Sequence, residues 1–195
     1  MTGRVLRPSD YQRMPWKNGG GTTTEIWKAA SPAGEMLWRI SIADVASDGP
    51  FSEFAGIDRW IMVISGKGME LTIEGLGARH LDRPFEPLFF PGDAKTDCRL
   101  IAGPIRDFNL MVARSFGSGS LRVVHLAPNA TRAFAENIVA LHVLRGDIEL
   151  MSSALHQLSS GDSWIAGSYG DVSARAAAPA IVAVTIIDPQ ERSAL

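Results

Sequence analysis

VISGKGMEL (residues 63–71) and VLRGDIEL (residues 143–150) carry the same pattern twice: an apolar run, a glycine, and an alternating run. Short apolar runs around a glycine are typical of two β-strands joined by a tight turn. A second pair of similar segments, FPGD (90–93) and SSGD (159–162), lies further along the chain. The interval between paired glycines is eleven residues longer in the first copy, which predicts a surface loop inserted at 75–87. The repeat therefore predicts two structurally similar β-halves.

The rest of the chain also consists of short apolar runs separated by Gly, Pro and Asp. Few windows have the 3.6-residue period of an amphipathic helix, so the sequence predicts an all-β protein, either a sandwich or a barrel. The exception is a short helix expected over Asp10–Met14 and capped by Ser9. The strands are expected at Leu37–Ala43, Arg59–Ser65, Met69–Ile73, Pro87–Phe90, Asp107–Arg114, Leu121–Leu126, Ile138–Leu144, Asp147–Met151, Ser163–Ala166 and Ile181–Ile187.

The two halves are expected at residues 1–117 and 118–195, joined by FGSGS (116–120). This connector is short enough for the halves to form one rigid body. The order strand, glycine turn, strand, loop, P-G-D turn, strand resembles the cupin barrel, and its repetition resembles a bicupin. That resemblance implies two fused double-stranded β-helix barrels of the jelly-roll type.

Composition excludes several classes of protein. The chain has 195 residues, a formal net charge of −2 and no basic block, so nucleic acid is not an expected partner. Its longest weakly polar run, 176–187, is interrupted by Pro179 and is too short to span a bilayer, so no membrane association is expected. The start of the chain lacks the apolar run of a signal peptide, so a cytoplasmic location is expected. Cys98 is the only cysteine, which rules out an internal disulfide.

The histidine pattern argues against a bound metal. Metal-binding cupins place an H-x-H pair and a Glu before the glycine turn, and another His after the P-x-G turn. Here Ile57–Ile61 and Ala94–Asp97 contain no histidine, and His142 stands alone before the second glycine turn. Because zinc and iron sites need three or four converging ligands, no metal and no other cofactor is expected.

The run MPWKNGGGTTTEI (14–26) is the first candidate binding segment. Consecutive glycine amides can form an anion-binding nest, and Lys17 and Asn18 would add a charge and hydrogen-bonding groups. A nucleotide-binding P-loop is rejected, because its lysine follows the glycines and precedes a helix. The alternative is a tight turn that feeds the first strand, with Trp16 capping the barrel.

A second candidate lies on the strand WRISIA (38–43), where Arg39 and Ser41 share one face. These side chains point either to solvent or into a polar barrel mouth. In a barrel mouth Arg39 would clamp a carboxylate. The alternative is a surface arginine paired with Asp58 or Glu53, which contributes little energy.

A third candidate lies on the strand that begins at Asp107. Asp107 and Asn109 alternate there with Phe108 and Leu110. Two short polar side chains on one strand face suit the floor of a polar pocket, or equally the solvated edge of a sheet. Spacing leaves both possibilities open.

Four blocks, in order within the first 114 residues, together resemble the HutD/Ves family: PWKNGGGTTTEI (15–26), WRISIADVASDGPFSEFAGIDR (38–59), FPGDAKTD (90–97) and GPIRDFNLMVAR (103–114). The resemblance implies a bicupin without the usual metal ligands and a pocket built mostly from the first half. One departure is Ala55, where the family pattern has proline. The residues that match the family pattern, and form the candidate ligand-binding set, are Lys17, Asn18, Arg39, Ser41, Phe54, Asp58, Arg59, Asp107 and Asn109.

The same resemblance implies a role beside histidine utilisation or, in the Ves branch, in stress or cold response. A role proposed for the family is a brake on histidine breakdown through binding of an intermediate such as urocanate or formylglutamate. We therefore expect a metal-free sensor of a small anionic metabolite, in which Arg39 or Arg59 grips a carboxylate. The alternatives are a metal-independent enzyme, with Asp58 or Asp107 as general base and Lys17 as electrostatic stabiliser, and a protein-interaction regulator. A homodimer is also expected.

Overall fold

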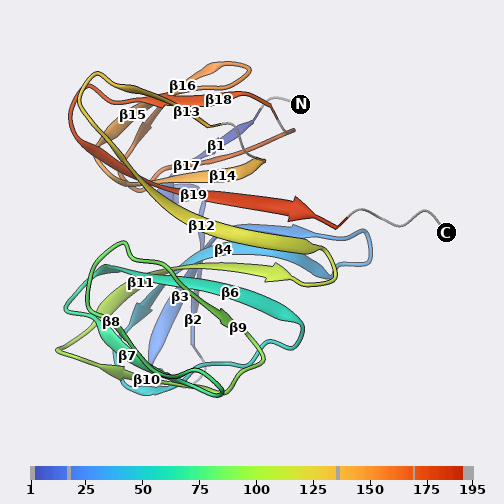
Figure 1. Ribbon diagram of the computed structural model, residues 1–195, viewed down its shortest axis with the longest axis vertical. Coiled ribbons are helices and arrows are strands. Elements are labelled where there is room, and N and C mark those ends of the chain that lie inside the picture. The colour runs from blue at the N-terminus through green and yellow to red at the C-terminus, as the bar shows by residue number, and fades with distance from the viewer. Residues whose placement is uncertain (1–2, 17–18, 135–136, 169, 191–195) are drawn as a thin grey trace. The chain divides into compact units, whose positions relative to one another are not determined.

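The computed structural model describes residues 3–16, 19–134, 137–168 and 170–190, and their regular secondary structure is almost entirely β-strand (Figure 1). Among the described residues, no helix combines the length and the apolar character needed to cross a membrane.

Backbone contacts divide the chain into two compact units, each of which is described by itself. Unit 1 comprises residues 1–11 and 119–188, and unit 2 comprises residues 12–118 and 189–195. The expected division between residues 117 and 118 placed residues 1–11 in the first half. Their contacts group them with unit 1, because the first strand pairs there.

Unit 2 contains two antiparallel sheets. Its larger sheet has the strand order β2 (Gln12–Pro15), β3 (Gly21–Ala30), β4 (Met36–Val45), β11 (Ile105–Ala113), β6 (Ile57–Ser65) and β9 (Leu88–Pro91). Its smaller sheet has the order β5 (Gly49–Pro50), β10 (Thr96–Leu100), β7 (Met69–Ile73) and β8 (Gly77–Leu81). Apolar residues of both sheets, among them Ile61, Leu71 and Phe90, form one buried core. The burial of this apolar surface stabilises the pairing of the sheets.

Unit 1 repeats this arrangement. Its larger sheet has the order β1 (Arg4–Leu6), β17 (Ser163–Ile165), β14 (Ile138–Arg145), β19 (Ala180–Pro189) and β12 (Gly117–Leu126). Its smaller sheet has the order β13 (Thr131–Phe134), β18 (Val172–Arg175), β15 (Asp147–Met151) and β16 (Leu155–Ser159). Leu141, Leu150 and Val182 belong to the core of this unit. The segment FGSGS, expected as a connector, runs into β12, which starts at Gly117.

The two glycine turns of the repeat occupy equivalent places. Gly66 joins β6 to β7, and Gly146 joins β14 to β15, so each turn leads from the larger sheet to the smaller one. Both glycines have positive φ, 102° and 83°. A Cβ at Gly66 would lie 2.7 Å from the Ile105 side chain, and one at Gly146 would lie 3.0 Å from Ala180. Both turns therefore require glycine for the same two reasons, backbone conformation and close packing.

The expected match between FPGD and SSGD is wrong. Gly92 follows β9, the edge strand that pairs with β6, whereas Gly161 precedes β17, the strand that pairs with β14. The two similar turn sequences thus occupy connections between strands that are not equivalent in the two units. The inserted surface loop inferred from this match is also wrong, because β8 lies within it and pairs with β7.

The helix expected over Asp10–Met14 does not form. Pro8–Asp10 is a single turn of 3-10 helix, and Gln12–Pro15 is the edge strand β2. This strand pairs antiparallel with Thr22–Glu25 of β3. Pairing with the TTTE stretch of the next strand therefore overrides the local helix signal.

Candidate ligand-binding cavity

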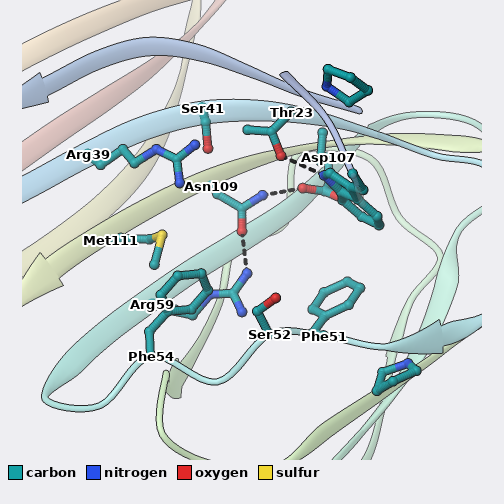
Figure 2. A pocket seen from close by; sticks show the side chains of 14 residues that line it. Thr23, Arg39, Ser41, Phe51, Ser52, Phe54, Arg59, Asp107, Asn109 and Met111 are labelled. Atoms are coloured by element: carbon teal, nitrogen blue, oxygen red, sulfur yellow. Dashed lines mark hydrogen bonds between the residues drawn. The ribbon is translucent and has the colours of Figure 1, made fainter. Parts of the chain in front are cut away.

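Unit 2 contains a cavity of about 470 Å³ (Figure 2). Three strands of its larger sheet, β4, β6 and β11, supply the polar side chains, and the loop around residues 50–54 supplies much of the apolar wall. The cavity is lined by Pro15, Trp16, Thr23, Arg39, Ser41, Ala43, Pro50, Phe51, Ser52, Phe54, Arg59, Asp107, Asn109 and Met111.

Strand register brings the polar residues together in rows. Met111 of β11 lies opposite Arg39 on β4 and opposite Arg59 on β6. The next row inward places Asn109 opposite Ser41 on β4. Since residues two apart on a strand share a face, alternation directs all five side chains toward the cavity. The alternation expected for β4 and β11 is confirmed. The polar side chains on the shared face line the cavity instead of facing solvent.

Arg59 is a buried charge held by aromatic rings. The residue is only 7% exposed. Its guanidinium carbon lies 4.9 Å from the ring centroid of Phe90 and 5.5 Å from the ring centroids of Phe51 and Phe54. Burial lowers the pKa of Arg59 to about 10, against the attraction of Asp107. The group is therefore charged at neutral pH, and the cation–π contacts offset part of its desolvation.

Asn109 connects Arg59 to Asp107 (Figure 2). The Nη2 group of Arg59 donates a hydrogen bond of 2.9 Å to Oδ1 of Asn109, and the Nδ2 group of Asn109 donates to Oδ1 of Asp107. An amide thus stands between the cation and the carboxyl. Nε of Arg59 and Oδ2 of Asp107 are buried without a hydrogen-bond partner among the described residues.

Asp107 lies deepest in this set, at 1% exposure, beside Ala43 and Val63 of the neighbouring strands. Burial raises the pKa of Asp107 to about 7, although the charge of Arg59 and the hydrogen bond from Asn109 both oppose the rise. The carboxyl therefore changes its charge near neutral pH.

The positive charge of Arg39, unlike that of Arg59, is paired directly with a carboxylate. Its Nε atom lies 2.8 Å from a carboxylate oxygen of Glu25 on β3. The partners expected for a surface arginine, Asp58 and Glu53, do not hold it. Because Arg39 has a carboxylate of its own, Arg59 is the cation of the cavity that is better placed to attract an incoming anion.

The N-terminal glycine run forms a tight turn. The Gly19 amide donates to the Trp16 carbonyl, and a Cβ at Gly21 would lie 3.0 Å from the Trp16 ring. The indole of Trp16 in turn donates to Oγ1 of Thr23. The Gly19 amide therefore closes the turn instead of serving an anion-binding nest, and Trp16 is a wall of the cavity. Lys17 and Asn18 lie outside the described residues.

Asp58 does not line the cavity, contrary to expectation. It precedes Arg59 on β6, so its side chain lies on the opposite face of the sheet. There it accepts a hydrogen bond of 2.8 Å from Nε of Arg114, which also bonds Asp93. The members of the expected set that do line the cavity together are Arg39, Ser41, Phe54, Arg59, Asp107 and Asn109.

The sequence model of the HutD family matches residues 8–183. The chain belongs to the HutD family. Its relatives include a 21.2 kDa protein of Pseudomonas putida, described as uncharacterized and encoded in the hutC 3′ region, which is 48% identical over 114 residues. That match covers 56% of this chain and 58% of the relative, which is less than two thirds of its length. The protein Ves of Cronobacter sakazakii is 33% identical over 165 residues, or 82% of this chain and 87% of Ves.

Solved structures agree with this assignment. HutD of Pseudomonas fluorescens SBW25 is 34% identical, with a TM-score of 0.78 over 96% of this chain and all of that one. An oxalate decarboxylase of Lactobacillus farciminis is only 8% identical, but it has a TM-score of 0.74 over 97% of this chain and 87% of that one. The second likeness concerns the fold alone. This HutD-family chain thus has the bicupin fold that its sequence resembles.

The cavity does not fit the metal that many cupins hold. Its polar lining consists of one carboxyl, one amide, two arginines and the hydroxyls of Thr23, Ser41 and Ser52, and the arginines would repel a cation. Across the described parts of the chain, no three His, Cys, Asp or Glu side chains gather as metal ligands would. The donor set is suited to an anion instead.

Several wall residues were not predicted as a group. Met111 shares the strand face of Asp107 and Asn109, so alternation could have identified it. Phe51 and Ser52 lie in the turn that follows Gly49, and a turn sequence does not reveal which side chains point inward. Thr23 lines the cavity where its hydroxyl accepts a hydrogen bond from Trp16, a contact that the sequence pattern does not indicate.

Proposed function

We propose that this chain binds a small carboxylate metabolite in the cavity of unit 2, without a metal, and thereby senses or restrains flux through histidine utilisation. The observation that carries the proposal is Arg59. A buried, charged guanidinium with an unpartnered Nε, facing a cavity, is suited to pair with a carboxylate. The compounds proposed are urocanate and formylglutamate.

The size and chemistry of the cavity support a small organic anion. A volume of about 470 Å³ lies within the range usual for small-molecule sites, roughly 300–1,000 Å³. Trp16, Phe51, Phe54 and Met111 offer apolar surface to a ring or an alkyl chain. Ser41 and Asn109 add neutral polar groups that would orient the ligand.

The link to histidine utilisation rests on the relatives. One of them is encoded beside hutC, and another is HutD itself. Both supply a pathway context rather than a ligand, so the choice between urocanate and formylglutamate depends on measurement.

Isothermal titration calorimetry with each compound tests the proposal. Saturable binding is expected for the wild type. Arg59→Met keeps much of the side-chain volume and removes the charge, and it should weaken binding at least about 30-fold, because losing one partner of a buried charge pair costs about 2–5 kcal/mol. Arg99→Ala is the matched control, since Arg99 is an exposed arginine of the same unit that pairs with Glu70. Absence of heat with both compounds, together with no shift in melting temperature, contradicts the proposal.

One observation favours a second function, a metal-independent enzyme. The pKa of Asp107, raised to about 7, suits a general acid or base at neutral pH. Asp58, the other base considered, is bound to Arg114 and does not face the cavity. Conversion of formylglutamate or urocanate that Asp107→Asn abolishes would favour the enzyme, whereas recovery of unchanged ligand after long incubation would favour binding alone.

A further inference from the structure

Asn109 determines which oxygen of Asp107 can carry a proton. A guanidinium only donates hydrogen bonds, so the Asn109 atom that faces Arg59 is the carbonyl oxygen. The amide nitrogen of Asn109 then faces Asp107 and donates to Oδ1. Because Oδ1 is occupied as an acceptor, a proton on this carboxyl resides on Oδ2, which has no partner among the described residues.

The surroundings of Asp107 balance its two protonation states near neutral pH. Burial favours the neutral carboxyl, while Arg59 and the Asn109 amide favour the carboxylate. The charged and titratable groups that interact with it are Arg59 on β6, Asp44 on β4 and Cys98 on β10, and Arg39 on β4 lines the same cavity. Arg39 is paired with Glu25, Asp44 repels a charge on Asp107, and the pKa of Cys98 is raised to about 12, so the thiol stays neutral.

A bound carboxylate disturbs this balance. It would place a second negative charge in the same buried space. It would also pair with Arg59 and so offset the positive charge that favours the ionised form of Asp107. Both effects raise the pKa of Asp107 further, since a nearby like charge disfavours the charged form. Binding therefore draws a proton from solvent when the pH is above about 7.

We propose that the cavity takes up its anion together with one proton, which Oδ2 of Asp107 carries and donates to an oxygen of the ligand. This inference rests on the proposed function. It also narrows the ligand class: the ligand presents a carboxylate to Arg59 and an oxygen acceptor, either a carbonyl or a second carboxylate, to Asp107. A ligand with an ammonium group at that end would meet an O–H donor and bind poorly.

N-Formylglutamate is the probe, because none of its groups titrates between pH 6 and 9. If only urocanate binds, the proposal is overturned, because urocanate has no oxygen beyond its single carboxylate to accept the proton of Asp107. For a site with a pKa of about 7, the Kd of formylglutamate should rise by up to about 30-fold from pH 6 to pH 8.5. Calorimetry at pH 8 in two buffers of different ionisation enthalpy should show uptake of close to one proton.

Asp107→Asn mimics the neutral carboxyl, with an N–H donor at the position of Oδ2. It should bind formylglutamate with a Kd independent of pH and without proton uptake. Asp58→Asn is the matched control, because Asp58 is an acidic residue beside Arg59 in sequence that faces Arg114 instead; it should keep the full pH dependence of the wild type.

The outcomes separate the two proposals. Binding to the wild type with a constant Kd and no proton uptake overturns the proton-coupled site and leaves the proposed function intact. No binding of either compound at any pH overturns both. If Asp107→Asn fails to fold, the proton count of the wild type decides alone.

Discussion

The two units share one arrangement of strands, but the inward-facing residues are partly polar in unit 2 and apolar at the corresponding positions of unit 1. Counting back from the equivalent glycines 66 and 146, Ile61 and Val63 of β6 correspond to Leu141 and Val143 of β14. Further back, Arg59 pairs with Met111 of β11, and the register shift in β14 brings Ile138 to the matching place, where it pairs with Ile186 of β19 and belongs to the apolar core. Ile105 packs at Gly66 as Ala180 packs at Gly146. The positions of β11 that hold Asp107 and Asn109 therefore correspond to Val182 and Val184 of β19, and the strand registers agree.

The three polar residues of unit 2, Arg59, Asp107 and Asn109, thus correspond to apolar residues of unit 1, Ile138, Val182 and Val184. Val182 and Val184 are at most 1% exposed and belong to the apolar core of their unit. Arg59, Asp107 and Asn109 are also buried, but hydrogen bonds through Asn109 link them and they border a cavity. The comparison shows that the barrel itself does not require polar residues at these positions, which makes a binding role the simplest reason for them.

The strongest test of this comparison is to place the carboxyl of unit 2 in unit 1. Val182→Asp introduces a carboxyl at the position equivalent to Asp107 but without an arginine or asparagine at the equivalent partner positions, Ile138 and Val184. A fully buried, unpaired carboxyl shifts its pKa by about 3–5 units, so the loss of stability at pH 8 is about 4–7 kcal/mol. Urea unfolding at pH 8 and pH 5 measures it, and recovery at pH 5 should be partial. An unchanged midpoint at pH 8 would contradict the equivalence.

The second test concerns the pH dependence of stability in unit 2. The pKa of Asp107 is raised from 3.8 to about 7, so the folded chain holds a proton that the unfolded chain releases. Stability due to this group should fall as the pH rises from about 4 to about 7 and stay constant above, by up to about 4 kcal/mol at 1.36 kcal/mol per pKa unit. Asp107→Asn removes the slope, so its melting temperature relative to wild type should be higher at pH 8 than at pH 5. Asp58→Asn is the control. If the difference in melting temperature between Asp107→Asn and the wild type is the same at pH 5 and pH 8, the raised pKa of Asp107 is refuted.

The third test asks whether the polar set acts as a unit. Asn109→Val copies the residue of unit 1 and leaves Arg59 and Asp107 without their bridge, which costs about 2–3 kcal/mol for the unpaired buried groups. The triple variant, with valine at 59, 107 and 109, removes all three polar groups and should be more stable than the single variant. Chemical denaturation of both gives the ranking. If the triple variant is the less stable, the polar set stabilises the fold rather than serving a ligand.

The outline of this fold could be predicted because its strongest signals are local. Apolar runs around Gly66 and Gly146 mark strand–turn–strand units by themselves, and alternation alone places Arg39 with Ser41, and Asp107 with Asn109, on shared strand faces. That these faces point inward is shown only by the structure. The strands β8 and β16 were missed because they are exposed edges with polar sequences. A three-residue strand such as β1 has no local signal, and only its pairing with β17 defines it.

The site was predicted less completely, for a physical reason. Which residues lie on neighbouring strands depends on register, and the bridge from Arg59 through Asn109 to Asp107 requires the pairing of β6 with β11. Asp58 belongs to the expected set because it matches the family pattern, yet alternation places it on the face opposite Arg59. A match to a family pattern does not distinguish a residue that lines the cavity from one that forms an ion pair outside it, as Asp58 does with Arg114.

The smallest expected effect belongs to the polar network that unit 1 does contain. Tyr11 donates its hydroxyl hydrogen to the Gly161 carbonyl at 2.6 Å, since a carbonyl can only accept. Ser163 must then donate to the Tyr11 oxygen at 2.9 Å, and Nδ1–H of His142 donates to Ser163 at 2.8 Å. This direction of donation leaves Nδ1 of His142 unable to act as a base toward Ser163.

Ser163→Ala removes the centre of that network and leaves the buried Nδ1–H of His142 without this acceptor. The expected loss is about 1–2 kcal/mol of unfolding free energy, with no change in the affinity of unit 2 for formylglutamate. Tyr11→Phe, which keeps the ring and removes the hydroxyl, should cost about 1 kcal/mol. Denaturation and calorimetry on the same samples separate the two readouts. A loss of affinity without a loss of stability would mean that unit 1 contributes to ligand binding, and the contrast between an apolar, structural interior and a polar, binding one would then fail.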